Sequence, residues 1–214
     1  MNFTTYLVDD DPGVLKALAR IVRTAGYDSR QYSSPRDFLR EHDPSVPGCA
    51  ILDLTMPELD GLQLQRCLAD DSIDRPIIFL TGNGDIPSSV QAMKAGAIDF
   101  LTKPVRREQL LAAIARAEEK DTAARKIRDR RRSAESKLGR LTPREREVLG
   151  HVIAGQLNKQ IAAILGTAEK TVKVHRGRMM AKLGVRSVAG LVRFCQEADI
   201  RPMFSQTVGI DVGP

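Results

Sequence analysis

The chain has 214 residues, 42% of them hydrophobic, which is enough for one large packed domain or two smaller ones. No apolar run reaches the roughly 18 residues of a membrane span, and the N-terminus lacks a basic and apolar leader. Cys49, Cys67 and Cys195 are odd in number and widely spaced, which predicts buried thiols in a reducing compartment and no disulfide or zinc framework. We therefore expect a cytoplasmic protein with no membrane partner.

Charge is divided unevenly along the chain. Residues 1–120 hold 14 Lys and Arg against 18 Asp and Glu, a net charge of −4. Residues 121–214 hold 19 Lys and Arg against 9 Asp and Glu, a net charge of +10. The two halves together give the formal net charge of +6. A basic half joined to an acidic half favours nucleic acid as the partner of the basic half, and charge scattered for solubility is the alternative.

The first half alternates short apolar runs with helical patterns. Strands are expected near 4–8, 28–32, 49–53, 76–80 and 98–101. Helices are expected near 12–25, 35–42, 61–70, 86–95 and from 106 onward. Five consecutive βα units predict a doubly wound α/β domain with a five-stranded parallel sheet.

Polar residues follow four of these strands at the edge where ligands bind in open α/β sheets. They are Asp9 and Asp10, Asp53, Thr81 and Lys103. Three close carboxylates repel one another unless a cation such as Mg²⁺ binds them, and a carboxylate is a known covalent phosphoryl acceptor. We expect a divalent cation and a phosphoryl group at this site, with Asp53 as the acceptor; a lone Asp of this kind would be a turn or cap residue.

The second half begins with a charged segment and continues with four short helical patterns. The pattern from 106 to 138 predicts one long helix, so residues 121–140 would be a helical charged linker, with a flexible tether as the alternative. Thr142 and Glu145 have the spacing of a capping box, Asn158 is expected to cap the next helix, and two further helices are expected near 168–183 and 187–197. For the last helix the expected core positions are Val188, Leu191, Val192 and Cys195. Two short helices joined by a tight turn indicate a helix-turn-helix within an all-α four-helix domain.

The helix near 168–183 separates an apolar side from a basic side. Val172, His175, Met179 and Leu183 share one side, so His175 is interpreted as a packed residue. The opposite side and its flanks suit a DNA major groove, and a solvated helix surface is the alternative. The expected DNA-binding residues are Lys170, Thr171, Lys173, Val174, Arg176 and Arg178.

Residues 4–120 resemble the flavodoxin-like receiver domain of bacterial two-component response regulators. The matching segments are Leu7-Val8-Asp9-Asp10-Asp11, Leu52-Asp53-Leu54-Thr55-Met56-Pro57, Asp60-Gly61, Leu80-Thr81-Gly82 and Lys103-Pro104. The resemblance implies that a sensor histidine kinase phosphorylates Asp53, and that Mg²⁺ or Mn²⁺ is bound by Asp10, Asp53 and the Thr55 carbonyl, with Asp9 assisting through water. It implies that Thr81 and Lys103 support the chemistry.

The same resemblance implies a switch. Thr81 and Phe100 would be the switching pair, with an ordinary core position as the alternative for Phe100, and the Lys103-Pro104 bond is often cis in this family. The readout surface would comprise the strand near 76–80, the helix near 86–95, the strand near 98–101 and the following helix. Residues on or near that surface are Asp85, Lys94, Ala95, Asp99 and Arg106.

Residues 141–198 resemble a LuxR-type helix-turn-helix, and both resemblances together indicate the NarL/FixJ class. The matching segments are Leu141-Thr142-Pro143-Arg144-Glu145-Arg146-Glu147-Val148-Leu149, Asn158-Lys159-Gln160-Ile161-Ala162, Thr171-Val172-Lys173-Val174-His175 and Lys182-Leu183-Gly184-Val185. Two departures are Ala168, where many members carry a capping serine, and Gly177, where some members carry a basic residue. Loss of the serine cap is expected to weaken the start of the helix by about 1 kcal/mol unless Thr167 substitutes, and Gly177 costs about 1 kcal/mol of helix propensity relative to alanine.

The resulting hypothesis is a phosphorylation-dependent transcription regulator. Its parts would be a receiver at 1–120, the linker at 121–140, a LuxR-type domain at 141–200 and a tail at 201–214. Phosphorylation would promote a homodimer on a double-stranded DNA promoter, with an activating role and RNA polymerase as a further possible partner. The receiver would support only its own phosphoryl transfer and autodephosphorylation.

Two alternatives stay open. One is a constitutive DNA-binding protein whose receiver does not switch. The other is an aspartyl-phosphate phosphatase of the haloacid-dehalogenase type, which needs an aspartate two residues after the nucleophile, where this chain has Thr55.

Overall fold

The computed structural model describes residues 3–70, 73–82, 86–198 and 200. The chain divides into two compact units, Met1–Arg125 and Lys126–Pro214. Within the described residues, no helix is both long and apolar enough to cross a membrane. The expected tail at 201–214 lies outside the described part of the chain.

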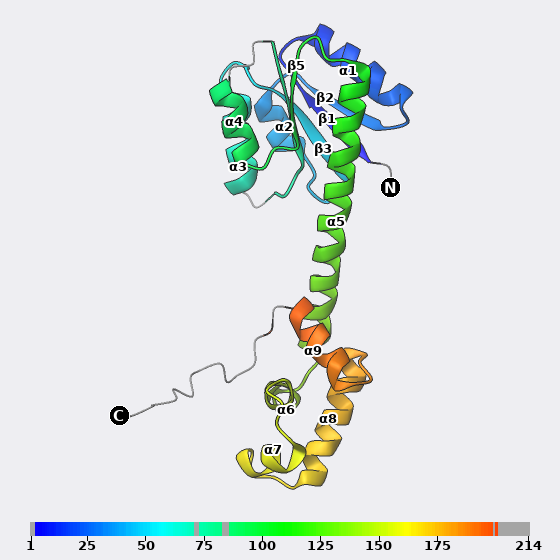
Figure 1. Ribbon diagram of the computed structural model, residues 1–214, viewed down its shortest axis with the longest axis vertical. Coiled ribbons are helices and arrows are strands. Elements are labelled where there is room, and N and C mark those ends of the chain that lie inside the picture. Colours follow the sequence, from blue (N-terminus) through cyan, green and yellow to red (C-terminus); the bar gives the residue numbers. More distant parts are fainter. Residues whose placement is uncertain (1–2, 71–72, 83–85, 199, 201–214) are drawn as a thin grey trace, which may run out of the picture. The chain divides into compact units, whose positions relative to one another are not determined.

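The first unit is built on a five-stranded, wholly parallel sheet with the order β2-β1-β3-β4-β5 (Figure 1). Its strands are β1 (Thr4–Val8), β2 (Asp28–Tyr32), β3 (Gly48–Asp53), β4 (Ile77–Thr81) and β5 (Asp99–Thr102). Its helices are α1 (Pro12–Thr24), α2 (Pro35–Glu41), α3 (Gly61–Asp70), α4 (Ile86–Lys94) and α5 (Arg107–Gly139). The predicted doubly wound fold is confirmed, and every predicted strand lies within one residue of its observed bounds.

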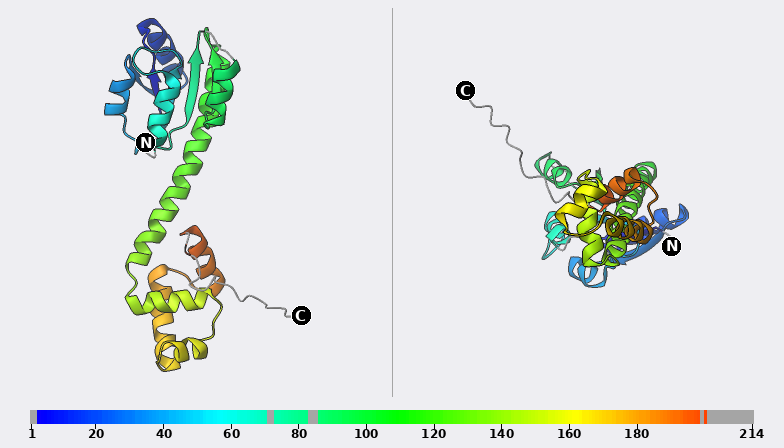
Figure 2. Two further views of the ribbon diagram at one scale, coloured as in Figure 1. Left: turned by 90° about the vertical axis from the view of Figure 1, so that its left-hand side faces the viewer. Right: turned by 90° about the horizontal axis from the view of Figure 1, so that it is seen from below.

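Helices cover both faces of the sheet, and each face has its own core (Figures 1 and 2). On one face, α1 contributes Leu15, Leu18 and Val22, and α5 contributes Leu110 and Ile114. The other face packs against α2, α3 and α4 around the fully buried side chains of the second core, which include Tyr6, Phe38, Leu64, Leu68 and Phe79. Alternate strand residues point to opposite faces, so two apolar faces require the continuous apolar runs seen in the sequence.

The second unit contains α6 (Pro143–Ile153), α7 (Asn158–Ile164), α8 (Glu169–Leu183) and α9 (Val188–Glu197). The last turns of α5 also belong to its core, since Ala134 is 3% exposed and Leu138 packs beside it. The capping box of Thr142 and Glu145 is present as predicted. The segment from 107 to 139 is helical throughout, as the pattern from 106 to 138 predicts.

Two sequence predictions in this unit are wrong. Asn158 is the first helical residue of α7 and not its cap; Leu157 occupies the cap position, where its backbone N–H donates to Gln160 Oε1. Val188 and Val192 are 40% and 38% exposed, while Phe194 is 7% exposed. The face of α9 that meets the core is centred on Leu191, Phe194 and Cys195, which leaves the two valines on its outer side.

A buried histidine at the end of α2 is held by a buried arginine. Arg75 Nε donates to His42 Nε2 at 2.9 Å, and both residues are buried. Burial and, secondly, the positive charge of Arg75 lower the pKa of His42 from 6.5 to about 4, while Asp43 acts weakly in the opposite direction. The imidazole is therefore neutral in the folded unit at neutral pH.

This pKa shift predicts acid sensitivity of the first unit. The folded pKa lies below the unfolded one, so the stabilisation is complete above about pH 6.5 and is lost as pH falls toward about 4. We expect His42 to make the free energy of unfolding about 2 kcal/mol lower at pH 5 than at pH 7. The chain has no tryptophan and its three tyrosines lie in this unit, so tyrosine fluorescence during urea unfolding reports on it alone.

The matched variants are His42→Gln and His175→Gln, the latter in the second unit. We expect His42→Gln to lose most of this pH dependence and His175→Gln to retain it. An unchanged pH profile in His42→Gln would contradict the assignment.

Candidate functional sites

An ammonium group lies between two carboxylates at the carboxyl edge of the sheet. Lys103 Nζ is 2.6 Å from Asp9 Oδ2 and 3.1 Å from Asp53 Oδ1. Asp9 directly follows β1, Asp53 ends β3, and Lys103 directly follows β5, so three strands bring together groups up to 94 residues apart. Asp9 is 1% exposed and Asp53 is 6% exposed.

The electrostatics of this cluster depend on its burial. Burial raises the pKa of Asp53, the negative charge of Asp9 adds to the increase, and Lys103 opposes both. For Lys103, burial acts to lower the pKa, but the hydrogen bonds and charges of Asp9 and Asp53 outweigh it and raise the pKa. The ammonium is therefore firmly protonated and stabilises two carboxylates that would otherwise repel each other.

Asp10 completes the acidic cluster from an exposed position. Ligating oxygens of Asp9, Asp10 and Asp53 all lie within 4.8 Å of one another. Both oxygens of Asp9 already accept hydrogen bonds, from the Asp11 backbone N–H and from Lys103. Hard carboxylate oxygens of this kind fit Mg²⁺, with Asp10 and Asp53 more available to it than Asp9. The exposed Thr55 lies two residues beyond Asp53.

Thr81 and Phe100 lie on neighbouring strands of the same edge. Thr81 is 1% exposed at the end of β4, and its carbonyl accepts from the Lys103 backbone N–H. Phe100 is half-buried on β5 opposite Phe79, with 6.2 Å between their ring centroids. Strand alternation puts Thr81 and Phe100 on the same sheet face. The Lys103-Pro104 bond is cis, as the resemblance implied.

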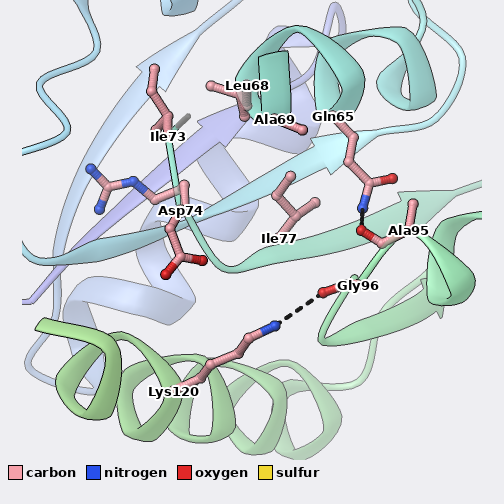
Figure 3. A pocket seen from close by; sticks show the side chains of 10 residues that line it. Gln65, Leu68, Ala69, Ile73, Asp74, Ile77, Ala95, Gly96 and Lys120 are labelled. Atoms are coloured by element: carbon pink, nitrogen blue, oxygen red, sulfur yellow. Dashed lines mark hydrogen bonds between the residues drawn. The ribbon is translucent and has the colours of Figure 1, made fainter. Parts of the chain in front are cut away.

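A pocket of about 390 Å³ lies at the opposite edge of this sheet (Figure 3). Gln65 of α3 donates to the Ala95 carbonyl, and Lys120 of α5 donates to the Gly96 carbonyl. These bonds attach two helices to the turn between α4 and β5. Its lining includes Ala95 of the predicted readout surface but none of the predicted phosphorylation, metal or DNA-binding residues, so the acidic cluster is a separate feature.

The second unit presents a basic helix face, on α8. Lys170, Lys173, Val174 and Arg178 are exposed, while Thr171 is intermediate. Val172, Met179 and Leu183 are buried on the other side as expected, but His175 is only partly buried. As the sequence indicated, the cap position Ala168 makes no side-chain hydrogen bond, and Gly177 is exposed with open space around it.

Arg176 is held by Asn158, which the sequence pattern predicted to be a helix cap. Its Nη1 donates to Asn158 Oδ1 at 3.0 Å, which joins the start of α7 to the middle of α8. The two residues are 18 positions apart, so no local pattern in the sequence indicates the contact. The amide of Asn158 thus orients Arg176.

Comparison with known proteins agrees with both units. Residues 6–115 match the response regulator receiver domain, and residues 139–195 match the luxR family of bacterial regulatory proteins. The chain belongs to the NarL/FixJ class of response regulators. Response regulators of this class carry a receiver and a LuxR-type DNA-binding domain and regulate transcription.

Full-length relatives support this assignment. The response regulator protein TmoT of Ectopseudomonas mendocina is 48% identical over 193 residues, covering 88% of this chain and 86% of TmoT. The transcriptional regulatory protein FixJ of Rhizobium meliloti is 38% identical over 201 residues, covering 94% of this chain and 98% of FixJ. The solved structure of the response regulator StyR has 42% identity and a TM-score of 0.85, covering 92% of this chain and all of StyR.

Removal of the Lys103 charge tests the electrostatics of the cluster. Lys103→Met leaves the carboxylates without their ammonium, so we expect a loss of about 2 kcal/mol in the stability of the receiver without divalent cations. Addition of Mg²⁺ is expected to raise the melting temperature more in Lys103→Met than in the wild type, because the ion replaces the missing positive charge. Tyrosine fluorescence during heating measures both effects.

The control is Lys94→Met, which removes an exposed lysine of α4. We expect it to behave as the wild type. Equal responses of Lys103→Met and wild type to Mg²⁺ would show that the ammonium does not balance the cluster.

Proposed function

We propose that this response regulator is switched by phosphorylation of Asp53 and then binds DNA as a homodimer in the cytoplasm. The observation that carries the proposal is Lys103 between Asp9 and Asp53, in a chain that also holds a basic helix-turn-helix. We assign residues 1–120 to the receiver, 121–140 to the linker, 141–200 to the DNA-binding domain and 201–214 to a tail. Receiver packing extends to Arg125, where the first compact unit ends.

A sensor histidine kinase would supply the phosphoryl group. An oxygen of Asp53 attacks phosphorus, the phosphorus–nitrogen bond of the kinase phosphohistidine breaks, and an acyl phosphate forms on Asp53. Lys103 is placed to move its hydrogen bond from Asp53 to the incoming phosphoryl oxygens. Asp10, Asp53 and the Thr55 carbonyl would hold Mg²⁺ or Mn²⁺, with Asp9 acting through water.

The bound metal would neutralise negative charge on the transferring group. Hydrolysis of the acyl phosphate in the same site would limit the lifetime of the active state. This autodephosphorylation would be the only reaction that the receiver supports besides its own phosphoryl transfer.

The switch would operate through Thr81 and Phe100. The Thr81 hydroxyl would move toward the phosphoryl group, and the half-exposed ring of Phe100 would turn inward to fill the space that it leaves. The affected surface comprises β4, α4, β5 and α5, where Asp99 is paired with Arg116. Lys94, Ala95 and Arg106 are exposed at this surface, and Asp85 lies outside the described residues.

Exposed apolar residues on α4 support dimerisation through the receiver. Ile86, Val90 and Met93 are 78%, 45% and 46% exposed, and their spacing puts them along one helix face. A contiguous apolar stripe of this kind is typical of a surface that another protein covers. We propose that phosphorylation makes this surface competent for a second copy.

The output would be binding to a promoter through α8. Lys170, Lys173, Val174 and Arg178 would enter the major groove, and Thr171 and Arg176 would contact the backbone. A homodimer suits a two-fold DNA site, and we propose an activator that contacts RNA polymerase. The phosphatase alternative is disfavoured because Thr55 stands where its second aspartate is required. A constitutive DNA-binding protein is distinguished by the following experiment.

Phosphorylation is tested by the mass and elution volume of the purified chain with Mg²⁺ and acetyl phosphate. We expect a phosphate-sized mass increase and a shift toward dimer in the wild type, and neither in Asp53→Asn. Phosphate uptake without a change in size would retain the chemistry and exclude phosphorylation-driven dimerisation. If neither acetyl phosphate nor a histidine kinase phosphorylates the wild type, the constitutive alternative holds.

The contact between Asn158 and Arg176 gives a second test. If Arg176 contacts DNA phosphates, Arg176→Ala should weaken binding to a generic duplex about fivefold and lower the salt slope by about 1. Asn158→Ala should weaken binding less, because it only frees the Arg176 side chain. Fluorescence anisotropy at several salt concentrations measures both.

The double variant provides the decisive comparison. In the Arg176→Ala background, Asn158→Ala should not weaken DNA binding further, because Asn158 acts only by orienting Arg176. Additive effects would mean that Asn158 contacts DNA independently. Gln196→Ala, an exposed amide on α9, is the control and should leave binding unchanged.

A further inference from the structure

The loop between α2 and β3 is fixed through its backbone carbonyl groups. Arg75 donates to the carbonyls of Asp43, Val46 and Gly48, each at 2.9 Å, in addition to His42 Nε2. Arg75 is 6% exposed, and its guanidinium lies 5.0 Å from the centre of the Tyr6 ring. A planar guanidinium with several donors can hold one loop conformation in a way that an ammonium cannot.

A second arginine holds the same loop from α5. Arg125 donates to the carbonyls of Pro44 at 3.1 Å, Ser45 at 2.6 Å and Val46 at 2.7 Å. Its Nε donates at 2.7 Å to Asp121 Oδ2, one helical turn earlier, and Asp121 is 1% exposed. The Pro47 carbonyl accepts from the Thr4 backbone N–H. Every carbonyl from 43 to 48 therefore accepts a hydrogen bond, and five of the six accept from these two arginines.

The loop also has no room to shift toward β1. A Cβ atom at Gly48 would lie 2.1 Å from the Thr4 carbonyl oxygen and 3.2 Å from Arg75 Nη1. Glycine at this position allows the start of β3, the start of β1 and the arginine to approach one another. We call this assembly of Arg75, Arg125, Asp121 and residues 43–48 the arginine clamp.

The clamp joins the far ends of the strands that carry the candidate phosphorylation site. β3 begins at Gly48 inside the clamp and ends at Asp53. β4 begins two residues after Arg75 and ends at Thr81. Arg125 is the last residue of the first compact unit, and α5 continues beyond it to Gly139. The two arginines therefore connect the starts of β3 and β4 to α5 at the point where it leaves the receiver.

We propose that Arg125 and Arg75 are positioning residues that couple the state of Asp53 to α5 at its exit from the receiver. The proposal rests on the phosphorylation switch proposed above. Packed strands and a saturated hydrogen-bond network are the kind of contiguous physical connection that can carry such coupling. The segment of α5 after Arg125 transmits the change because its helical register is fixed at the clamp.

The test measures coupling, defined as the ratio of DNA affinities with and without phosphorylation. The DNA is a duplex selected from a random library with the phosphorylated wild type. In the full-length chain, Arg125→Ala should reduce this ratio by about fivefold or more. Phosphate uptake at Asp53, followed by mass, should be unchanged, because Arg125 lies at the opposite edge of the sheet.

The matched control is Arg128→Ala, which removes the same charge from the same helix at an exposed position beyond the clamp. It should keep the wild-type ratio. Arg125→Lys keeps the charge but cannot span three carbonyls, so it should give an intermediate ratio. A residue that only stabilised the receiver would change its melting temperature and leave the ratio as it is.

Several outcomes would overturn the proposal. A wild-type ratio in a folded Arg125→Ala protein refutes the clamp and leaves the phosphorylation switch intact. A loss of phosphate uptake in Arg125→Ala would locate its effect at Asp53 and also refute coupling through α5. No response of the wild-type protein to phosphorylation would refute the proposed function itself. If Arg125→Ala does not fold, Asp121→Asn is tested instead, because this substitution removes the charge that orients Arg125. A wild-type ratio of DNA affinities in Asp121→Asn would then refute the proposal.

Discussion

The chemistry of the receiver depends on one ammonium group between two buried carboxylates. Asp9 and Asp53 are both less than a tenth exposed, and a pair of this kind is unfavourable without a positive charge. Lys103 supplies that charge from a third strand, so the site exists only when β1, β3 and β5 are correctly assembled. The same arrangement keeps Asp53 close to a cation that can pass to a phosphoryl group, which links the stability of the fold to its proposed reaction.

At the opposite end of the strands, their amino ends, the cationic side chains have a different role. There Arg75 and Arg125 bind neutral backbone carbonyls, and the result is a fixed loop without a reactive group. Strands β3 and β4, which join the two ends, are short and buried along their whole length, so they act as stiff connections. With the reactive groups at one end of the strands and the clamp at the other, a local change at Asp53 can, in the proposed mechanism, displace α5.

Much of this was accessible from the sequence because the signals are local. Apolar runs predicted the strands, and strand ends predicted the meeting of Asp9, Asp53 and Lys103. The contacts that the sequence did not indicate are those between distant residues. Asn158 is of a residue type that commonly caps helices, but its amide oxygen accepts a hydrogen bond from Arg176 on the next helix. Val188 and Val192 have core spacing, but only the neighbouring face of α9 meets the core, where Phe194 is buried. Arg75 and Arg125 carry no motif, since any loop offers carbonyls and only the fold decides which arginine reaches them.

The division of charge limits how a phosphorylation switch can work in this chain. The receiver is already acidic, and conversion of the Asp53 carboxylate into an acyl phosphate with nearly two negative charges adds about one further charge, which takes residues 1–120 from −4 to about −5. The DNA-binding half is strongly basic, so phosphorylation alone increases its electrostatic attraction to the receiver and thereby opposes DNA binding. Activation therefore cannot come from simple charge repulsion. It requires a change of conformation or of oligomeric state, and the exposed stripe on α4 and the clamp at the exit of α5 are two features of the described receiver through which the Thr81–Phe100 switch can act.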